Sequence, residues 1–347
     1  MSDWSFIRPA RPQGDTKIHA QEEALMSGWT TEDIPSQGGK LAVVTGATSG
    51  VGYEAALALA RAGADVIIAG IDEAQGHAAL GKIRPLAPAS LLRFEKLDLS
   101  KLASVADFAE RIARTERPVD LLINNAAVMS LPQRTVSVDG FEMQLATNYL
   151  GHFALTGQLL PLLRRGMDTR VVQVSSIAHR FGAIRFYDMQ FERDYSPFKA
   201  YSQSKLALLI FALELQRRSD SGDWRLLSAA AHPGYARTNL VEQDAGAKSL
   251  LSKPHRILGT WISHSAATGA LSTLYAATAQ KARPGMYYGP KGAFELVGPL
   301  GVAAIGKKAQ DLGIAQRLWE ISERLTGVKW PLPYAPTSKL PWPKATR

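Results

Sequence analysis

Short apolar runs alternate with longer amphipathic stretches from about residue 40 to residue 290, and this rhythm limits the possible folds more than any other feature of the chain. The short runs are typical of buried strands, whereas the stretches between them have the periodicity of helices. Strands are expected at 41–45, 65–69, 91–97, 119–124, 170–175 and 226–231. Helices are expected at 51–61, 73–83, 102–116, 140–165, 200–218, 263–279 and 307–325.

Such an alternation predicts an α/β fold, in which a doubly wound parallel sheet lies between two layers of helices. Ligands of these folds bind at the carboxyl ends of the strands. We expect one domain over residues 39–327, without internal repeats. Residues 1–38 read as a polar N-terminal extension and linker, and residues 328–347 as a basic, proline-rich, extended tail.

Composition excludes several classes of site. The 347 residues contain no cysteine, so disulfides, thiolate metal sites and a cysteine nucleophile are excluded. No His-x3-His or Glu-x2-His spacing suggests a metal site, and none is expected. The net charge of +9 is not gathered into a dense basic run with aromatics, so we expect no nucleic-acid partner. No apolar run reaches the roughly 18 residues of a membrane span, and no signal peptide is recognisable, so a cytoplasmic protein is expected.

A glycine-rich turn joins the first expected strand to the first expected helix. Gly46 permits the sharp turn, Gly50 lets the backbone approach a pyrophosphate, and Gly52 permits close packing of helix on strand. The helix start then offers free N–H groups and partial positive charge to an anion. We therefore predict a dinucleotide-binding turn with these cofactor contacts: Gly46, Thr48, Ser49, Val51 and Gly52. The alternative is an ordinary tight turn between a strand and a helix.

This Gly-x3-Gly-x-Gly spacing resembles the turn of the short-chain dehydrogenase/reductase family, whose Rossmann fold is the doubly wound sheet expected here. Other motifs of that family follow in order: Asn124-Asn125-Ala126-Ala127, with Ala127 replacing a glycine; Asn148 within Thr147–His152; Ser175-Ser176; Tyr201-x3-Lys205; and His232-Pro233-Gly234 with Thr238. The ordered set is specific, and the resemblance covers roughly residues 28–325.

Within the family, the chain is most similar to the retinol dehydrogenase-like and protochlorophyllide reductase-like branch. Four features carry this likeness: Gly28-Trp29-Thr30 with Asp33-Ile34-Pro35, Ser175-Ser176-Ile177-Ala178-His179, Tyr287-Tyr288-Gly289-Pro290, and an inserted segment at about 181–197.

The resemblance implies a catalytic set of Asn148, Ser176, Tyr201 and Lys205. Tyr201 and Lys205 are four positions apart and share one helix face. A free tyrosine has a pKa of about 10, and a neighbouring ammonium group lowers it. Tyr201 would then be the general acid/base, Ser176 would bind the substrate oxygen, and Asn148 would hold a water that links Lys205 to solvent. The alternative for Tyr201 and Lys205 is a pair on the protein surface. The alternative for Ser176 is a cap at the end of a strand, and that for Asn148 is an amide on a helix surface.

The resemblance also implies the remaining cofactor contacts. They are Ile71, Asp98, Leu99, Asn125, Ala126, Ala127, Tyr201, Lys205, Pro233, Gly234 and Thr238, and His232 is expected to shape the backbone beside Pro233.

The choice between NAD and NADP depends on the end of the second strand. Gly70 stands where NAD enzymes of the family carry an acid, and Ile71 where NADP enzymes carry an arginine. Asp72 comes two positions too late and is expected to cap the next helix. The missing cation favours NAD, although the branch mostly implies NADP.

A lipophilic alcohol, ketone or aldehyde is the expected substrate. The inserted segment supplies aromatic or apolar residues for one wall of the site: Phe181, Phe186, Tyr187, Met189, Phe191, Tyr195 and Phe198. A second wall would contain Leu240, Leu250, Leu251, Ile257, Leu258 and Trp261. The alternative is that the aromatics fill the core.

Three functions fit these patterns. The leading hypothesis is an NAD(P)-dependent dehydrogenase or reductase, followed by an NAD(P)-binding sensor or interaction protein on the same fold, and then by a reductase of C=C bonds. By analogy with family dimers, a homo-oligomer is expected that pairs the helices 140–165 and 200–218.

Overall fold

The sheet at the centre of the protein has eight strands in the order β3-β2-β1-β4-β5-β6-β7-β8. The computed structural model describes residues 26–129, 131–166, 168–235 and 265–331. Its strands are β1 Leu41–Thr45, β2 Asp65–Gly70, β3 Leu92–Lys96, β4 Leu121–Asn124, β5 Thr169–Val174, β6 Leu226–Ala231, β7 Tyr287–Pro290 and β8 Leu300–Val302. The first seven strands pair in parallel, and β8 runs antiparallel to β7.

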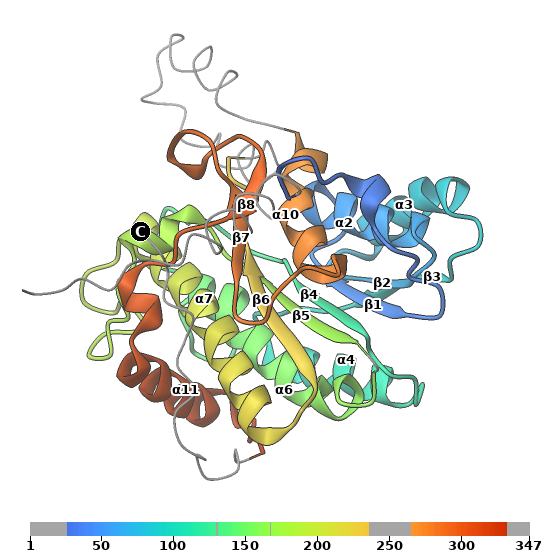
Figure 1. The fold of residues 1–347 in the computed structure, drawn as a ribbon. Helices are drawn as coiled ribbons and strands as arrows, with labels where there is room; N and C mark the ends of the chain where they lie inside the picture. Colours follow the sequence, from blue (N-terminus) through green and yellow to red (C-terminus); the bar gives the residue numbers. More distant parts are fainter. Residues whose placement is uncertain (1–25, 130, 167, 236–264, 332–347) are drawn as a thin grey trace, which may run out of the picture.

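Helices cover both faces of this sheet (Figure 1). One layer consists of α2 Gly50–Arg61, α3 Glu73–Ile83 and α10 Ala266–Thr278. The other consists of α4 Leu102–Ala113, α6 Gly151–Leu163, α7 Pro197–Gly222 and α11 Leu312–Thr326. Successive side chains of β1 enter opposite layers: Leu41 and Val43 join one core cluster, Ala42 and Val44 the other. The predicted doubly wound parallel sheet is confirmed.

Two strands were missing from the sequence prediction. β7 and β8 have only four and three residues, too few for a periodic pattern. β7 also contains Gly289 and Pro290, which are both uncommon within strands. Its residues had been recognised only as a family motif.

The expected helix 140–165 is a composite. Glu142 caps it, accepting hydrogen bonds from the backbone N–H groups of Gln144 and Leu145. A short α5, Met143–Leu145, leads into one turn of π-helix, η3 Ala146–Leu150, and then into α6. Gly140 lies before the helix, with a φ of +85°. A π-helical turn is typical of functional sites, and this one carries Asn148.

The last expected helix, 307–325, is divided. A 3-10 turn, η7 Lys307–Gln310, precedes α11. Asp311 separates the two because its backbone is extended and its side chain caps α11, accepting from the N–H of Ile314 at 2.9 Å.

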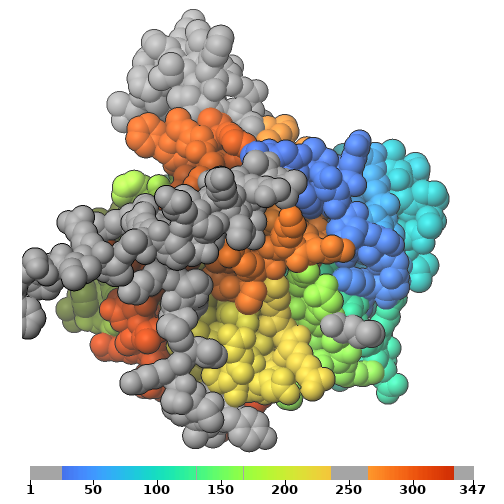
Figure 2. All heavy atoms as spheres, in the orientation of Figure 1, coloured from blue at the N-terminus to red at the C-terminus, as the bar shows by residue number. Residues whose placement is uncertain are grey.

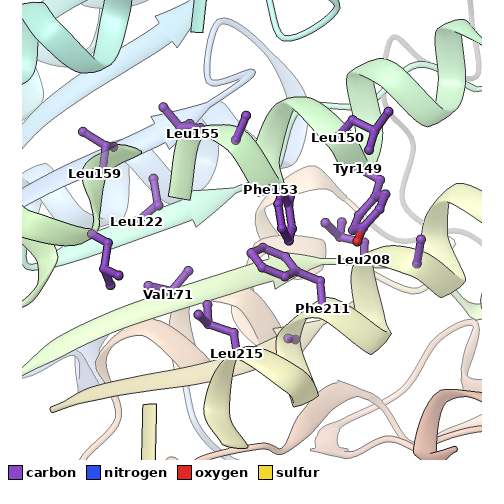
Figure 3. Close-up of a cluster of buried hydrophobic side chains, with 14 of the residues drawn as sticks. Leu122, Tyr149, Leu150, Phe153, Leu155, Leu159, Val171, Leu208, Phe211 and Leu215 are labelled. Atoms are coloured by element: carbon purple, nitrogen blue, oxygen red, sulfur yellow. The ribbon is translucent and has the colours of Figure 1, made fainter. Parts of the chain in front are cut away.

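The helices α6, α7 and α11 share an aromatic cluster. The ring of Phe153 on α6 lies 5.3 Å from Phe211 on α7 and 5.1 Å from Trp319 on α11. Trp330, past the end of α11, lies 4.7 Å from Trp319 and is buried. Figure 3 shows Phe153 and Phe211 facing each other over the sheet residues Leu122 and Val171.

This cluster closes the outward faces of α6 and α7. A Cβ added to Gly157 on α6 would lie 2.7 Å from Val328 and 2.9 Å from Trp330. Both helices are therefore buried nearly all round by this chain itself. A homo-oligomer would have to use surfaces other than the α6 and α7 faces that residues 328–330 cover.

The stretch before β1 also packs onto the fold. Met26 is buried, and the ring of Trp29 meets Tyr275 of α10 edge-on at 5.4 Å. Figure 2 shows the blue N-terminal part of the described chain adjoining orange segments from its C-terminal part. The packed body therefore includes residues on both sides of the range 39–327. None of the helices within the described ranges combines the length and the apolar character that a bilayer crossing requires.

Removal of the Trp330 side chain tests the aromatic cluster. Trp330→Ala leaves a cavity between α6, α7 and α11, and we expect it to lower the free energy of unfolding by about 3 kcal/mol. Leu312→Ala is the control on α11, since Leu312 is 55% exposed, and it should change stability by less than about 0.5 kcal/mol. Urea unfolding measures both. Equal effects of the two substitutions would contradict the assigned role of Trp330.

Candidate active site

The expected site residues lie at the carboxyl ends of β1 to β6. Between β1 and β4 the strand order reverses, which is where such sheets bind their ligand. The glycine turn follows β1 and the loop Asn125–Ala127 follows β4. The two are joined directly, because the amide nitrogen of the Asn125 side chain donates to the carbonyl of Thr45 at 2.9 Å.

The glycine turn has the shape that a bound pyrophosphate needs. Gly46 and Gly50 have φ angles of +64° and +59°, which favour glycine. A Cβ on Gly46 would lie 2.8 Å from the Cα of Ala126, and one on Gly52 would lie 2.4 Å from Asn125 Nδ2. Ser49, the N-cap of α2, makes no side-chain capping bond, so the first N–H groups of α2 are not capped from within the turn. This turn fits the phosphates of a nicotinamide dinucleotide.

A buried histidine connects this turn to the helix that carries Asn148. His152 Nδ1 lies 2.9 Å from the carbonyl oxygen of Asn148, and Nε2 lies 2.9 Å from Thr45 Oγ1. A carbonyl only accepts, so Nδ1 carries the hydrogen. Burial lowers the pKa of His152 to about 3, and the ring is therefore neutral and accepts the Thr45 hydroxyl at Nε2.

The same hydroxyl holds the loop after β4. Thr45 Oγ1 accepts the backbone N–H groups of Asn125 and Ala126 at 2.9 and 3.0 Å. With its own hydrogen directed to His152, every bonding position of this buried oxygen is used. His152 is part of the motif Thr147–His152, but the sequence alone had assigned it no role. The signal was its place four residues after Asn148, one helical turn away.

The Asn148 side chain joins three segments. Its Oδ1 accepts from the N–H of Val128, and its Nδ2 donates to the carbonyl of Val128 and to Ser204 Oγ, all within 2.9 Å. Asn148 is fully buried, which excludes the alternative of a surface amide. It therefore fixes the distance between the loop after β4 and α7.

Lys205 on α7 is anchored to the end of β5. Its Nζ donates to the carbonyl of Val174 at 2.8 Å, and the Ser175 hydroxyl donates to the carbonyl of Lys205 at 2.8 Å. The side chain is buried, and burial lowers the pKa of Lys205 to about 7. The ammonium and the neutral amine are therefore both populated near neutral pH.

Tyr201 lies beside Ser176, as the motifs predicted. The Ser176 side chain adjoins the phenol, and Lys205 Nζ lies 5.8 Å from the centre of the Tyr201 ring. Burial nevertheless raises the pKa of Tyr201 to about 12. The expected lowering of this pKa by Lys205 is wrong for the protein alone, because the lysine itself gives up charge when buried.

The residues expected at the adenosine end of the site are Ile71, Asp98 and Leu99. Ile71 follows β2 and is 59% exposed. Asp72 caps α3 by accepting from the N–H of Gln75, which confirms its expected role. Asp98 Oδ1 accepts two hydrogen bonds from Ser100, and Leu99 is buried against α6.

The expected nicotinamide end follows β6. His232 is fully buried, and its Nδ1 accepts the N–H of Gly234 at 3.2 Å, which confirms that it shapes the backbone around Pro233. Gly234 has a φ of +65°. Thr238 lies outside the described residues, and so does the expected second substrate wall, Leu240, Leu250, Leu251, Ile257, Leu258 and Trp261.

The first substrate wall is not one continuous surface. Met189 and Phe191 are buried and fill core, as the alternative held. Phe181 and Phe198 are exposed, and the centres of their rings lie 5.8 Å apart. Phe181 ends the short 3-10 turn that follows Ser176. Among the described residues, no group of three or more His, Asp or Glu side chains could hold a metal ion.

This geometry is that of a dehydrogenase. A family model described as short chain dehydrogenase matches residues 40–248, and the chain belongs to that family. Polyprenol dehydrogenase of Mus musculus is 40% identical over 300 residues, 85% of this chain and 86% of that protein. Retinol dehydrogenase 12 of Homo sapiens is 38% identical over 294 residues, 84% and 88% of the two chains.

A solved structure supports the same assignment. An uncharacterized protein from Mycobacterium Paratuberculosis is 41% identical, with a TM-score of 0.73 over 88% of this chain and all of the other. The chain is therefore an NAD(P)-dependent oxidoreductase acting on alcohol or carbonyl groups, in the retinol dehydrogenase-like branch, as the motifs predicted.

The depressed pKa of Lys205 predicts a pH-dependent stability. The folded group titrates near pH 7 and an unfolded lysine near 10.5, so between these values the unfolded chain binds more protons. The free energy of unfolding should therefore rise from pH 7 to 9.5 in the ligand-free protein. In Lys205→Met the slope of the free energy of unfolding against pH should be smaller, by at most the contribution of one proton. Urea unfolding at several pH values measures this slope for both proteins. An unchanged slope in the variant would show that the pKa of Lys205 is not lowered in the folded protein.

Proposed function

We propose that the protein transfers a hydride between a nicotinamide cofactor and a lipophilic alcohol, ketone or aldehyde, with Tyr201 as the general acid/base. One observation carries this proposal: Tyr201, Ser176 and Lys205 meet at the carboxyl end of β5, where Lys205 is hydrogen-bonded to Val174 and Ser175. A surface helix pair would show neither the burial of Lys205 nor the contact of Tyr201 with Ser176.

In the proposed reaction the cofactor supplies or accepts the hydride. Tyr201, protonated at rest because its pKa is about 12, donates its phenolic proton to a carbonyl oxygen, or accepts one from an alcohol in reverse. The Ser176 hydroxyl binds the same oxygen and stabilises the charge that develops there. Lys205, with a pKa of about 7, returns the proton to Tyr201, and the buried Asn148 holds α7 in place for this transfer.

When bound, an oxidised nicotinamide would add positive charge to the site, and Tyr201 would then hold its proton less tightly. The lowered phenol pKa expected from the sequence would thus arise in the complex and depend on both charges. The alternative, an NAD(P)-binding sensor on the same fold, gives no reason for a buried lysine within reach of a tyrosine and a serine.

We propose NAD as the preferred cofactor. The exposed apolar Ile71 offers no charge to a 2′-phosphate, and the carboxylate of Asp72 next to it repels one. The substrate class is supported by the exposed pair Phe181 and Phe198 and by the similarity to a polyprenol dehydrogenase and a retinol dehydrogenase.

The remaining proposals concern the surroundings of the enzyme. We propose a cytoplasmic protein that works without nucleic acid or metal. We also propose a homo-oligomer, whose contacts must lie away from the α6 and α7 faces closed by Trp330.

Substitution of Tyr201 by phenylalanine tests the mechanism. Tyr201→Phe removes only the phenolic oxygen, so the dissociation constant for the cofactor should stay within about twofold while kcat falls by about 10²–10⁴. Tyr187→Phe is the matched control: the sequence placed Tyr187 in the substrate wall, but it is 74% exposed and lies beside Ile321 and Leu325 of α11. Steady-state kinetics on a panel of lipophilic alcohols and aldehydes gives kcat. Near-normal turnover of Tyr201→Phe would remove this residue from the mechanism.

Substitution at position 71 tests the cofactor proposal. Ile71→Arg places a guanidinium where a 2′-phosphate would lie, and we expect it to tighten NADP binding about tenfold relative to NAD. Ala78→Arg adds the same charge on the exposed face of α3 and should leave the ratio unchanged. Calorimetric titration with both cofactors measures the ratio. Wild-type protein that binds NADP more tightly than NAD would overturn the preference proposed here.

A further inference from the structure

Glu295 occupies a strained position next to the site. It ends the turn η6 Ala293–Glu295, between β7 and β8. Both Phe294 and Glu295 have left-handed backbones, with φ angles of +53° and +59°. Such conformations are unfavourable in non-glycine residues and persist only when contacts hold them. Phe294 is 84% exposed, so within η6 the side-chain contacts belong to Glu295, while the backbone of Leu296 is bonded to the N–H of Tyr235 at 2.8 Å.

The carboxylate of Glu295 makes three contacts. Its Oε2 lies 2.5 Å from the Arg180 guanidinium and 3.5 Å from His232 Nε2, and its Oε1 accepts the N–H of Ala304 at 3.1 Å. Burial opposes ionisation, but the nearby His232 ring, the N–H of Ala304 and the charge of Arg180 outweigh it and hold the pKa of Glu295 at about 2. The group is therefore a carboxylate at all physiological pH values.

Arg180 connects this carboxylate to the serine side of the site. It lies in η4 Ile177–Phe181, the turn that begins directly after Ser176. His179 in the same turn donates from Nδ1 to the carbonyl of Ser176 at 2.7 Å. The ion pair thus holds the turn that carries Ser176 against the β7–β8 loop.

His232 connects the carboxylate to the opposite side. Its Nδ1 accepts the N–H of Gly234, so the neutral ring carries its hydrogen on Nε2, toward Glu295. Gly289 of β7 is required for this ring, because a Cβ there would lie 2.0 Å from Nε2. Tyr287 fills the space between the two histidines, with ring distances of 5.3 Å to His179 and 5.0 Å to His232.

We infer that Glu295, with Arg180 and His232, is a positioning residue that fixes the Ser176 turn relative to the Pro233–Gly234 loop. These are the two sides of the pocket expected to face the nicotinamide ring, so the inference rests on the proposed function. It gives a structural role to His179 of the Ser-Ser-Ile-Ala-His motif and to the Tyr-Tyr-Gly-Pro motif, because Tyr287 packs against His179 and His232 and Gly289 leaves room for the His232 ring.

The test compares a whole cofactor with a fragment that lacks nicotinamide. Glu295→Gln keeps the size of the side chain and its acceptor for Ala304 but removes the charge. Calorimetry should show about tenfold weaker binding of the dinucleotide and unchanged binding of ADP-ribose, or of its 2′-phosphate if NADP binds more tightly. Glu110→Gln, in the exposed pair with Arg114, is the control and should alter neither.

Arg180→Gln and the double variant complete the experiment. If the three residues act as one unit, the losses in dinucleotide affinity from Glu295→Gln and Arg180→Gln should not add in the double variant. Equal weakening of both ligands, unchanged binding of both, or additive losses would each overturn the inference. Should Glu295→Gln fail to fold, Arg180→Gln alone gives the same comparison. A wild-type protein that binds dinucleotide but turns over no substrate would refute the proposed function. The affinities of the variants for dinucleotide and ADP-ribose would still test the role of Glu295.

Discussion

The hydroxyl of Thr45 is the point on which the geometry of the site depends. Thr45 is the last residue of β1. Its hydroxyl oxygen accepts hydrogen bonds from two backbone N–H groups of the loop after β4 and donates its own hydrogen to His152. His152 in turn holds the carbonyl of Asn148, whose side chain holds Ser204 on α7. A continuous set of hydrogen bonds thus runs from the glycine turn to the helix of Tyr201 and Lys205. Because all its members are buried and satisfied, a loss at one place leaves an unpaired polar group at another.

Burial sets the resting charges of the acid/base pair. The protein alone favours a protonated Tyr201 and a Lys205 that titrates near neutrality. Both shifts disfavour charge in a site that lacks its ligand, which is what desolvation does to any ionisable pair. In the proposed mechanism the residues of the chain provide position, a proton and hydrogen bonds for the reaction.

Sequence reasoning recovered what depends on strand ends. Gly46 and Ser176 could be placed together because parallel strands of a doubly wound sheet deliver their carboxyl ends to one edge, whereas Tyr201, on a helix, was placed by the resemblance to the family. Glu295 could not be found in this way, since it reaches the site from a short strained turn after a strand of four residues. The pKa values of Tyr201 and Lys205 depend on burial, which motif spacing does not report. The aromatic segment failed as one wall because Phe191 enters the core, with a left-handed backbone that no pattern predicts.

The protonation state of His152 tests the account most directly. With ¹⁵N-labelled histidine, the ring nitrogens of the ligand-free protein can be followed by NMR between pH 5 and 8. The bonds to Thr45 and Asn148 require a neutral ring with its hydrogen on Nδ1 throughout this range. A ring that titrates near pH 6.5, or one with its hydrogen on Nε2, would show that the glycine turn and the Asn148 helix are not joined in this way.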